Sequence, residues 1–189
     1  MAEVTTYKAD HKPRPGPSVI NRDSRESDGI APPAAQFRRL IWLMPAAFAL
    51  HIIEEYGTGF PGWVGDIFGS SMTGVSFQGN NALFMAILLS LTLWASWRPS
   101  PVAAFFLLSW ASGNLFWNFI FHLTTTAIYG RHSPGLVTAV LLYFPISYVV
   151  ARTALSERVL TRTAFAGAVS IGAALMILVI CIGLLDVVS

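Results

Sequence analysis

The sequence predicts an all-α membrane protein: a bundle of five transmembrane helices, with the N-terminus in the cytoplasm and the C-terminus outside. Of the 189 residues, 54% are hydrophobic and only 12% are charged, whereas a soluble domain carries about 25% charged residues. Apolar runs near the roughly 20 residues that cross a bilayer recur along the chain. The lysines and arginines gather in the segments that a five-span chain keeps on one side.

Short polar turns separate the expected spans, with one longer connection. That connection, residues 57–79, is rich in Gly and Ser and contains the stretch FPGWVG, whose aromatic rings suit a membrane interface. The spans are expected at about residues 40–56, 80–97, 101–129, 135–150 and 164–188.

The positive residues predict the orientation. Residues 1–39 carry seven Lys and Arg, whereas the connection 57–79 carries none. With the N-terminus inside, eleven of the twelve positive residues lie in the cytoplasm and only Arg131 lies outside. The positive-inside rule therefore favours this arrangement, in a multi-pass protein of the plasma or inner membrane.

The first 36 residues differ from the rest. They are polar, rich in Pro and without apolar periodicity, so they cannot bury enough surface to offset the entropy of ordering. We expect residues 1–36 to be a disordered cytoplasmic tail and residues 37–189 to be the transmembrane domain.

Ionisable side chains close the first expected span, in the stretch HIIEE. His51, Glu54 and Glu55 fall within an arc of about 100° of a helix, so one face can present all three. Because the first span rises from the cytoplasm, this group is expected towards the outer surface.

A second polar stripe lies on the third expected span. Asn114, Asn118 and His122 follow an i, i+4, i+8 spacing on a helix whose other residues are mostly apolar. Such a stripe is expected to face protein or water rather than lipid. The predicted topology brings His122 nearly level with His51.

A charged side chain deep in a span costs roughly 2.5–3.5 kcal/mol. A proton on one glutamate, cationic histidines or a divalent metal ion would each lower that cost, and a purely structural hydrogen-bond network is the fourth interpretation. Histidine nitrogens and carboxylate oxygens from two helices suit Zn²⁺, Fe²⁺ or Mn²⁺.

The metal interpretation assigns roles to individual residues. His51, Glu54 and His122 are the expected metal ligands, and Glu55 is the expected catalytic base that activates water. The residues expected to support these ligands or to contact substrate are Asn118, Asn81, His132 and Tyr129.

HIIEE resembles the defining motif of the HXXEE-domain family of uncharacterised integral membrane proteins. That family is described by HxxEE, a further histidine and a Y-x-P-G motif. The further histidine corresponds to His122, and the third motif is similar to HSPG, residues 132–135. His132 stands where tyrosine is usual, and Tyr129 lies three residues earlier. The resemblance covers roughly residues 37–150 and implies a catalytic site, with no established reaction, substrate or metal.

We therefore expect a membrane-embedded, metal-dependent enzyme. A hydrolase that acts on a lipid or lipid-linked substrate from the outer leaflet is the simplest form. The alternatives are a proton-coupled transporter, and a non-catalytic scaffold or sensor in which the His–Glu network is structural. Five spans without a repeat lack the usual symmetry of transporters. The expected partners are the bilayer and a lipid-like substrate, with no nucleic acid.

Overall fold

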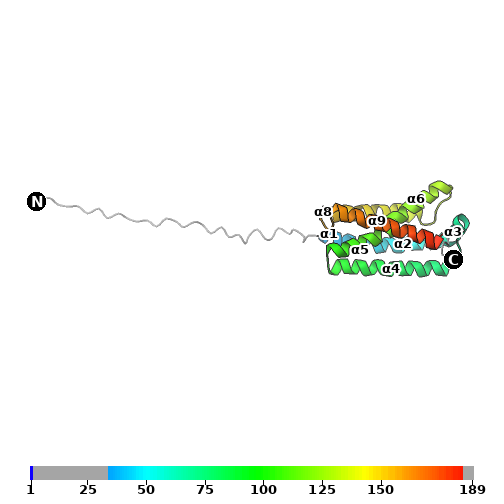
Figure 1. Cartoon of the computed structure of the whole chain (residues 1–189), viewed down its shortest axis with the longest axis horizontal. Coiled ribbons are helices and arrows are strands. Elements are labelled where there is room, and N and C mark those ends of the chain that lie inside the picture. Colours follow the sequence, from blue (N-terminus) through cyan, green and yellow to red (C-terminus); the bar gives the residue numbers. More distant parts are fainter. Residues whose placement is uncertain (2–33, 185–189) are drawn as a thin grey trace. The chain divides into compact units, whose positions relative to one another are not determined.

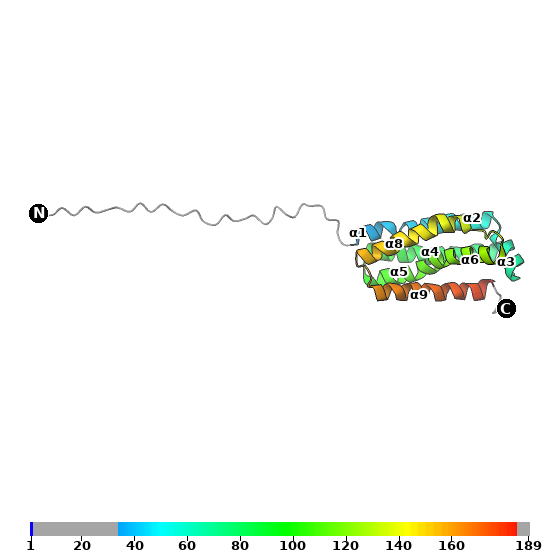
Figure 2. The same cartoon turned by 90° about the horizontal axis from the view of Figure 1, so that it is seen from above.

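The computed structural model describes Met1 and residues 34–184, and over these residues the secondary structure is helical. The long helices run side by side along one axis, as two perpendicular views show (Figures 1 and 2). The elements are α1 Ala35–Leu40, α2 Leu43–Gly57, α3 Phe60–Phe68, α4 Gly74–Trp97, α5 Pro101–Ala111, η2 Ser112–Trp117, α6 Asn118–Tyr129, α7 Leu136–Thr138, η3 Ala139–Tyr143, α8 Phe144–Ser156, α9 Arg162–Val179 and η4 Ile180–Leu184, where η marks π-helical segments. Most of the tail predicted for residues 1–36 lies outside the described residues, and α1 begins at Ala35.

Four helices are long and apolar enough to cross a membrane. They are Gly74–Trp97, Pro101–Tyr129, Leu136–Ser156 and Arg162–Gly183. These correspond to the second to fifth expected spans, and the first of them begins six residues before the expected start at Asn80. The all-α class is confirmed, and so is the presence of four helices long and apolar enough to span a membrane.

The first expected span, residues 40–56, corresponds mainly to α2 with 15 residues, and the short helix α1 with 6 residues precedes it. Ile41 and Trp42 between them keep right-handed helical dihedrals. Pro45 lacks the N–H that would bond the carbonyl of Ile41, so the helical hydrogen bonding is interrupted there. The count of five spans and the orientation of the termini remain predictions.

The long connection after α2 is more ordered than expected. It contains α3, which begins after Gly59 at φ 81° and ends before Gly69 at φ 73°. Phe60 and Trp63 of α3 are buried in an aromatic cluster with Phe77 of α4 and Phe121 of α6. Here the prediction of a Gly- and Ser-rich interfacial loop was wrong in part, because packing of these rings stabilises a helix that composition alone did not indicate.

Helix α9 lies very close to the third span. A Cβ added at Gly172 would lie 2.7 Å from the backbone nitrogen of Gly113 in η2. Glycine allows such close backbone approach between helices in a membrane. This contact holds α9 against the π-helical segment that precedes Asn118.

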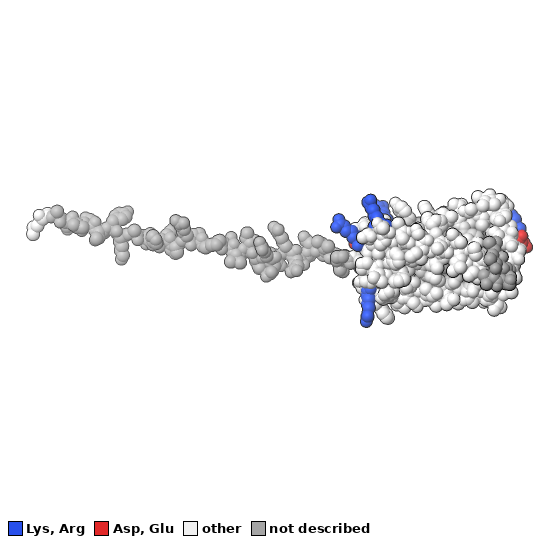
Figure 3. All heavy atoms as spheres, in the orientation of Figure 1, with Lys and Arg blue, Asp and Glu red and all other residues white. Residues whose placement is uncertain are grey.

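The two ends of the bundle differ in charge. The turns at one end meet around a cavity lined by Phe37, Pro99 and Arg158 among others, and arginine side chains gather at that end (Figure 3). At the other end Arg131 pairs with Asp66 of α3 at 3.2 Å. The described arginines of the first end are Arg38, Arg39, Arg98, Arg152, Arg158 and Arg162.

Candidate metal centre

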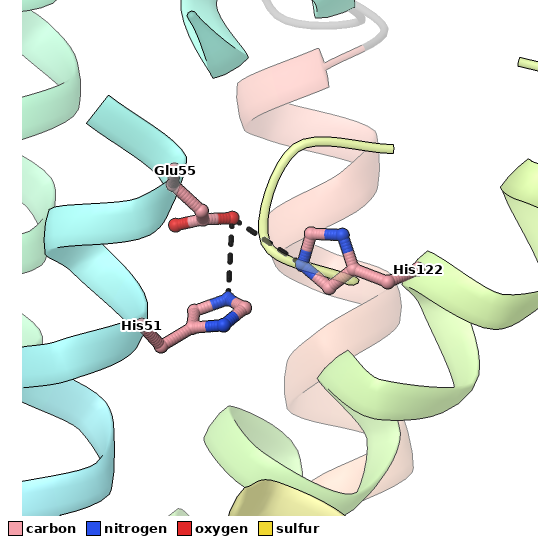
Figure 4. A group of neighbouring side chains, drawn as sticks. All are labelled: His51, Glu55 and His122. Atoms are coloured by element: carbon pink, nitrogen blue, oxygen red, sulfur yellow. Dashed lines mark ion pairs between the residues drawn. The ribbon is translucent and has the colours of Figure 1, made fainter. Parts of the chain in front are cut away.

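Three buried side chains converge near the end of the bundle that carries α3. His51 and Glu55 lie one turn apart on α2, and His122 comes from α6 (Figure 4). Glu55 Oε1 lies 3.4 Å from His51 Nε2 and 3.3 Å from His122 Nε2. Both histidines are fully buried, and Glu55 is 5% exposed. The two side chains that lie one turn apart on α2 therefore converge with the single histidine of α6.

The spacing of these atoms fits one metal ion. One ligand atom from each of the three residues lies within 4.8 Å of the others. Metal–ligand bonds of about 2.0–2.1 Å in a tetrahedron separate neighbouring ligand atoms by about 3.3 Å. The two Nε2–Oε1 distances of 3.4 and 3.3 Å match that separation. Two imidazoles and one carboxylate are also the ligand number of a catalytic zinc site rather than of a closed structural one.

The outer nitrogen of each imidazole is hydrogen-bonded to a hydroxyl group. His51 Nδ1 lies 2.8 Å from Thr138 Oγ1, and His122 Nδ1 lies 2.8 Å from Ser133 Oγ. The Thr138 hydroxyl also lies 3.3 Å from the carbonyl oxygen of Gly135 and can donate to it, which leaves the hydroxyl oxygen able to accept from His51 Nδ1–H. That tautomer leaves the lone pair of Nε2 facing Glu55. Hydrogen bonding of the outer nitrogen is typical of metal-bound histidine.

Among the described atoms, His122 Nε2 is buried without a hydrogen-bond partner. It and His51 Nε2 both face the carboxylate oxygen of Glu55. Electron-rich atoms this close are stable only if a proton or a cation lies between them. The arrangement can therefore bind a metal ion or hold protons on the imidazoles.

The loop before α7 closes over the cluster. Gly135 has φ 96°, a conformation that favours glycine. A Cβ added there would lie 2.7 Å from His51 Cε1, 2.9 Å from Glu55 Cγ and 2.9 Å from His122 Cε1. Only glycine fits between all three side chains, so the backbone of this loop packs directly against the cluster.

Glu54 lies in a different place from Glu55. Its two carboxylate oxygens accept hydrogen bonds from the backbone N–H groups of Val137 and Thr138, at 3.1 and 2.7 Å. These N–H groups open α7, where a carboxylate is stabilised by the orphan donors and the helix dipole. The sequence predicted Glu54 as a metal ligand and Glu55 as the base, whereas Glu55 joins the two histidines. The reason is that α7 offers Glu54 two donors, which the sequence of α2 does not reveal.

The other expected site residues lie at varying distances from the cluster. Asn118 Nδ2 is 3.4 Å from His51 Nε2, so Asn118 lies beside the centre. Asn81 donates to its own helix at Phe77 O and lines a cavity that also reaches Glu55. His132 and Tyr129 are exposed, and the Tyr129 ring packs edge-on against Phe68. No contact of these two with the histidines or Glu55 is present among the described residues.

Several residues at the centre were not predicted individually. The Tyr143 ring lies 4.3 Å from that of His51, and its hydroxyl is buried without a partner among the described atoms. Ser133 and Gly135 belong to the HSPG stretch, so the motif carried a signal for them. Thr138 precedes η3 and Tyr143 is its last residue, and both stand in an ordinary apolar run, which carries no such signal.

A family model described as "Protein of unknown function with HXXEE motif" matches residues 42–150 of this chain, which is more than half of it. The matched segment contains the three clustered side chains, the Gly135 loop and Glu54. No curated protein and no solved structure matches the chain.

Proposed function

The chain belongs to the family of proteins with the HXXEE motif, and from this premise we propose that it is a membrane-embedded metal-dependent enzyme. The proposed reaction is hydrolysis of a lipid or lipid-linked substrate, with access from the outer leaflet. The observation that carries the proposal is the convergence of two Nε2 atoms on one carboxylate at 3.4 and 3.3 Å. Zn²⁺, Fe²⁺ and Mn²⁺ all accept such a ligand set.

The proposed ligands are His51, His122 and Glu55, which differs from the set expected from sequence. A divalent ion bound by them would polarise a substrate carbonyl or phosphoryl oxygen and acidify water. Glu55 faces both histidines with one oxygen, while its other oxygen points away from them (Figure 4). That second oxygen is the proposed proton acceptor, and Asn118 is placed to contact substrate beside His51.

The arginine distribution supports the outer-leaflet access. Six described arginines lie at the end opposite the cluster, and the positive-inside rule favours the cytoplasm for that end. The cluster then lies in the outer half of the bilayer. A cysteine at the exposed position of Val75, in an otherwise cysteine-free variant, is expected to react with an impermeant reagent from outside. Reaction only from inside would reverse the orientation.

The metal content of the purified protein tests the proposed metal site. Protein purified in nanodiscs is expected to hold about one divalent ion per chain, and His51→Ala, His122→Ala and Glu55→Ala are expected to lose it. The matched control is His132→Ala, because His132 is an exposed histidine without a contact to the cluster among the described residues. Equal metal content in all four variants, or none in the wild type after metal loading, would refute the metal site.

A second candidate rests on the same distances. Protonated imidazoles would form ion pairs with Glu55 Oε1 at the observed 3.4 and 3.3 Å, which would make the cluster a proton relay or a structural network. This candidate predicts a protein that folds and works without metal. Unchanged thermal stability on removal of all metal would favour it over the enzyme.

A further inference from the structure

A cavity of about 220 Å³ lies beside the cluster, between α4, the η2–α6 helix and α9. It exceeds by far the roughly 10–15 Å³ that one water molecule needs, so it can hold part of an organic ligand. Glu55 contributes to its wall, which places the cavity in contact with the candidate metal centre.

The wall of the cavity is apolar except for Glu55 and four carboxamides. Phe60, Phe77 and Met176 are typical of the apolar part. The carboxamides belong to Asn80 and Asn81 at the start of α4 and to Asn114 and Asn118 on the η2–α6 helix. Apolar walls with a few convergent polar groups are typical of small-molecule sites.

The hydrogen bonds of three carboxamides determine what they offer to a ligand. Asn81 Nδ2 donates to Phe77 O at 3.0 Å, and Asn114 Nδ2 donates to Trp110 O at 2.8 Å. A backbone carbonyl can only accept, so each amide nitrogen must face the helix and each amide oxygen remains for a ligand. Asn118 Nδ2 lies 3.4 Å from His51 Nε2, so its amide is already engaged beside the cluster. The cavity therefore presents acceptors.

The charges around the cavity also favour a ligand that donates hydrogen bonds and carries no negative charge. None of its described lining residues is Lys or Arg, and Glu55 is the ionisable one among them. Arg131, the described arginine at this end of the bundle, is paired with Asp66. A phosphate in the cavity would be buried among amide oxygens and a carboxylate with no cationic side chain, which is unfavourable.

We propose that this cavity binds an acyl lipid whose head group is uncharged and carries hydroxyl donors, such as a monoacylglycerol, rather than a phosphate-bearing lipid. The hydroxyls donate to the amide oxygens of Asn81 and Asn114, and the acyl chain packs against the aromatic and α9 side chains. The inference rests on the proposed function only for the hydrolysis of that lipid, since binding requires no metal.

Photo-crosslinking in phosphatidylcholine nanodiscs tests the binding. The two probes share one diazirine-bearing acyl chain, and one is a monoacylglycerol while the other is a lysophosphatidic acid. The monoacylglycerol is expected to label α4 and α9 at about tenfold lower concentration than the phosphate probe. Asn81→Leu and Asn114→Leu are each expected to weaken its labelling about 3- to 10-fold, as for loss of one hydrogen bond.

Three controls make the result decisive. Ser90→Leu changes an exposed polar residue of α4 outside the cavity and is expected to label like the wild type. His51→Ala is expected to keep labelling even if it loses metal, so failure of the metal site is distinguished from failure of this inference. Met176→Trp fills the cavity from α9 and is expected to reduce labelling if an asparagine variant does not fold. Equal or stronger labelling by the phosphate probe, labelling unchanged in the cavity variants, or no labelling of the wild type would overturn the inference.

Discussion

Glu54 and Glu55 are neighbours in the chain, yet they belong to two different regions of the molecule. Glu55 lies on the face of α2 that meets α6, where it contacts His51 and His122 at 3.4 and 3.3 Å. Glu54 lies on the face that meets the start of α7, where it accepts from two backbone N–H groups. The same type of side chain therefore has two roles: Glu55 is a candidate metal ligand, and Glu54 caps the start of a helix.

The difference shows how the centre is assembled from both sides. The Glu54 region holds the start of α7, and α7 carries Thr138, whose hydroxyl oxygen lies 2.8 Å from His51 Nδ1. Glu54 therefore acts on the centre through the backbone, while Glu55 takes part in it directly. Removal of the Glu55 carboxylate is therefore expected to affect the protein differently from removal of the Glu54 carboxylate. The variants below run from the largest expected loss of metal to the smallest.

The matched pair Glu55→Gln and Glu54→Gln gives the sharpest contrast. Glu55→Gln is expected to lose the bound ion, because a neutral amide replaces the one carboxylate of the ligand set. Glu54→Gln is expected to keep the ion and to lose about 1–3 kcal/mol of stability, because one amide N–H group now faces a backbone donor. Metal content and thermal unfolding of both variants in nanodiscs measure this. Loss of metal from Glu54→Gln alone would reverse the assignment.

Gly135→Ala is expected to have the next largest effect. Its Cβ would lie within 2.7–2.9 Å of carbon atoms in all three clustered side chains, so the loop or the cluster must shift. Gly130→Ala is the matched control, because Gly130 has φ 62° but nothing within 4 Å of an added Cβ. Both variants are expected to be destabilised by about 1 kcal/mol or more from backbone strain. Only Gly135→Ala is expected to lose metal, and equal metal content in the two would show that the close approach is not needed.

The hydroxyl groups that bind the outer imidazole nitrogens are expected to have the smallest effect. Thr138→Val and Ser133→Ala are each expected to weaken metal affinity about 10- to 100-fold, as is usual for partners of metal-bound histidines. Thr125→Val is the control, since the Thr125 hydroxyl bonds only the carbonyls of its own helix among the described residues. Competition with a chromogenic chelator measures the affinity. If Thr125→Val weakens the affinity as much as the other two, the hydroxyls act only through general packing.

Much of the fold and part of the site could be predicted from the sequence. Long apolar runs predicted the helical class, because a bilayer or a core admits apolar helices and the length of each run is visible in the chain. The i, i+4 relation of His51 and Glu55 also follows from the sequence, because a helix places residues four apart on one face. The helix α3 could not be predicted in this way, since the burial of Phe60 and Trp63 against Phe77 and Phe121 involves residues distant in the chain.

The sequence by itself determined that ionisable groups stand on two apolar helices and that a third motif follows them. Only the tertiary structure decided which glutamate meets the histidines, because that choice depends on the rotation of α2 against α6 and α7. It also decided that Gly135, Thr138 and Tyr143 reach the centre. Donors, close approaches and cavities arise between segments that are far apart in the chain, and helical periodicity carries information only about one segment at a time.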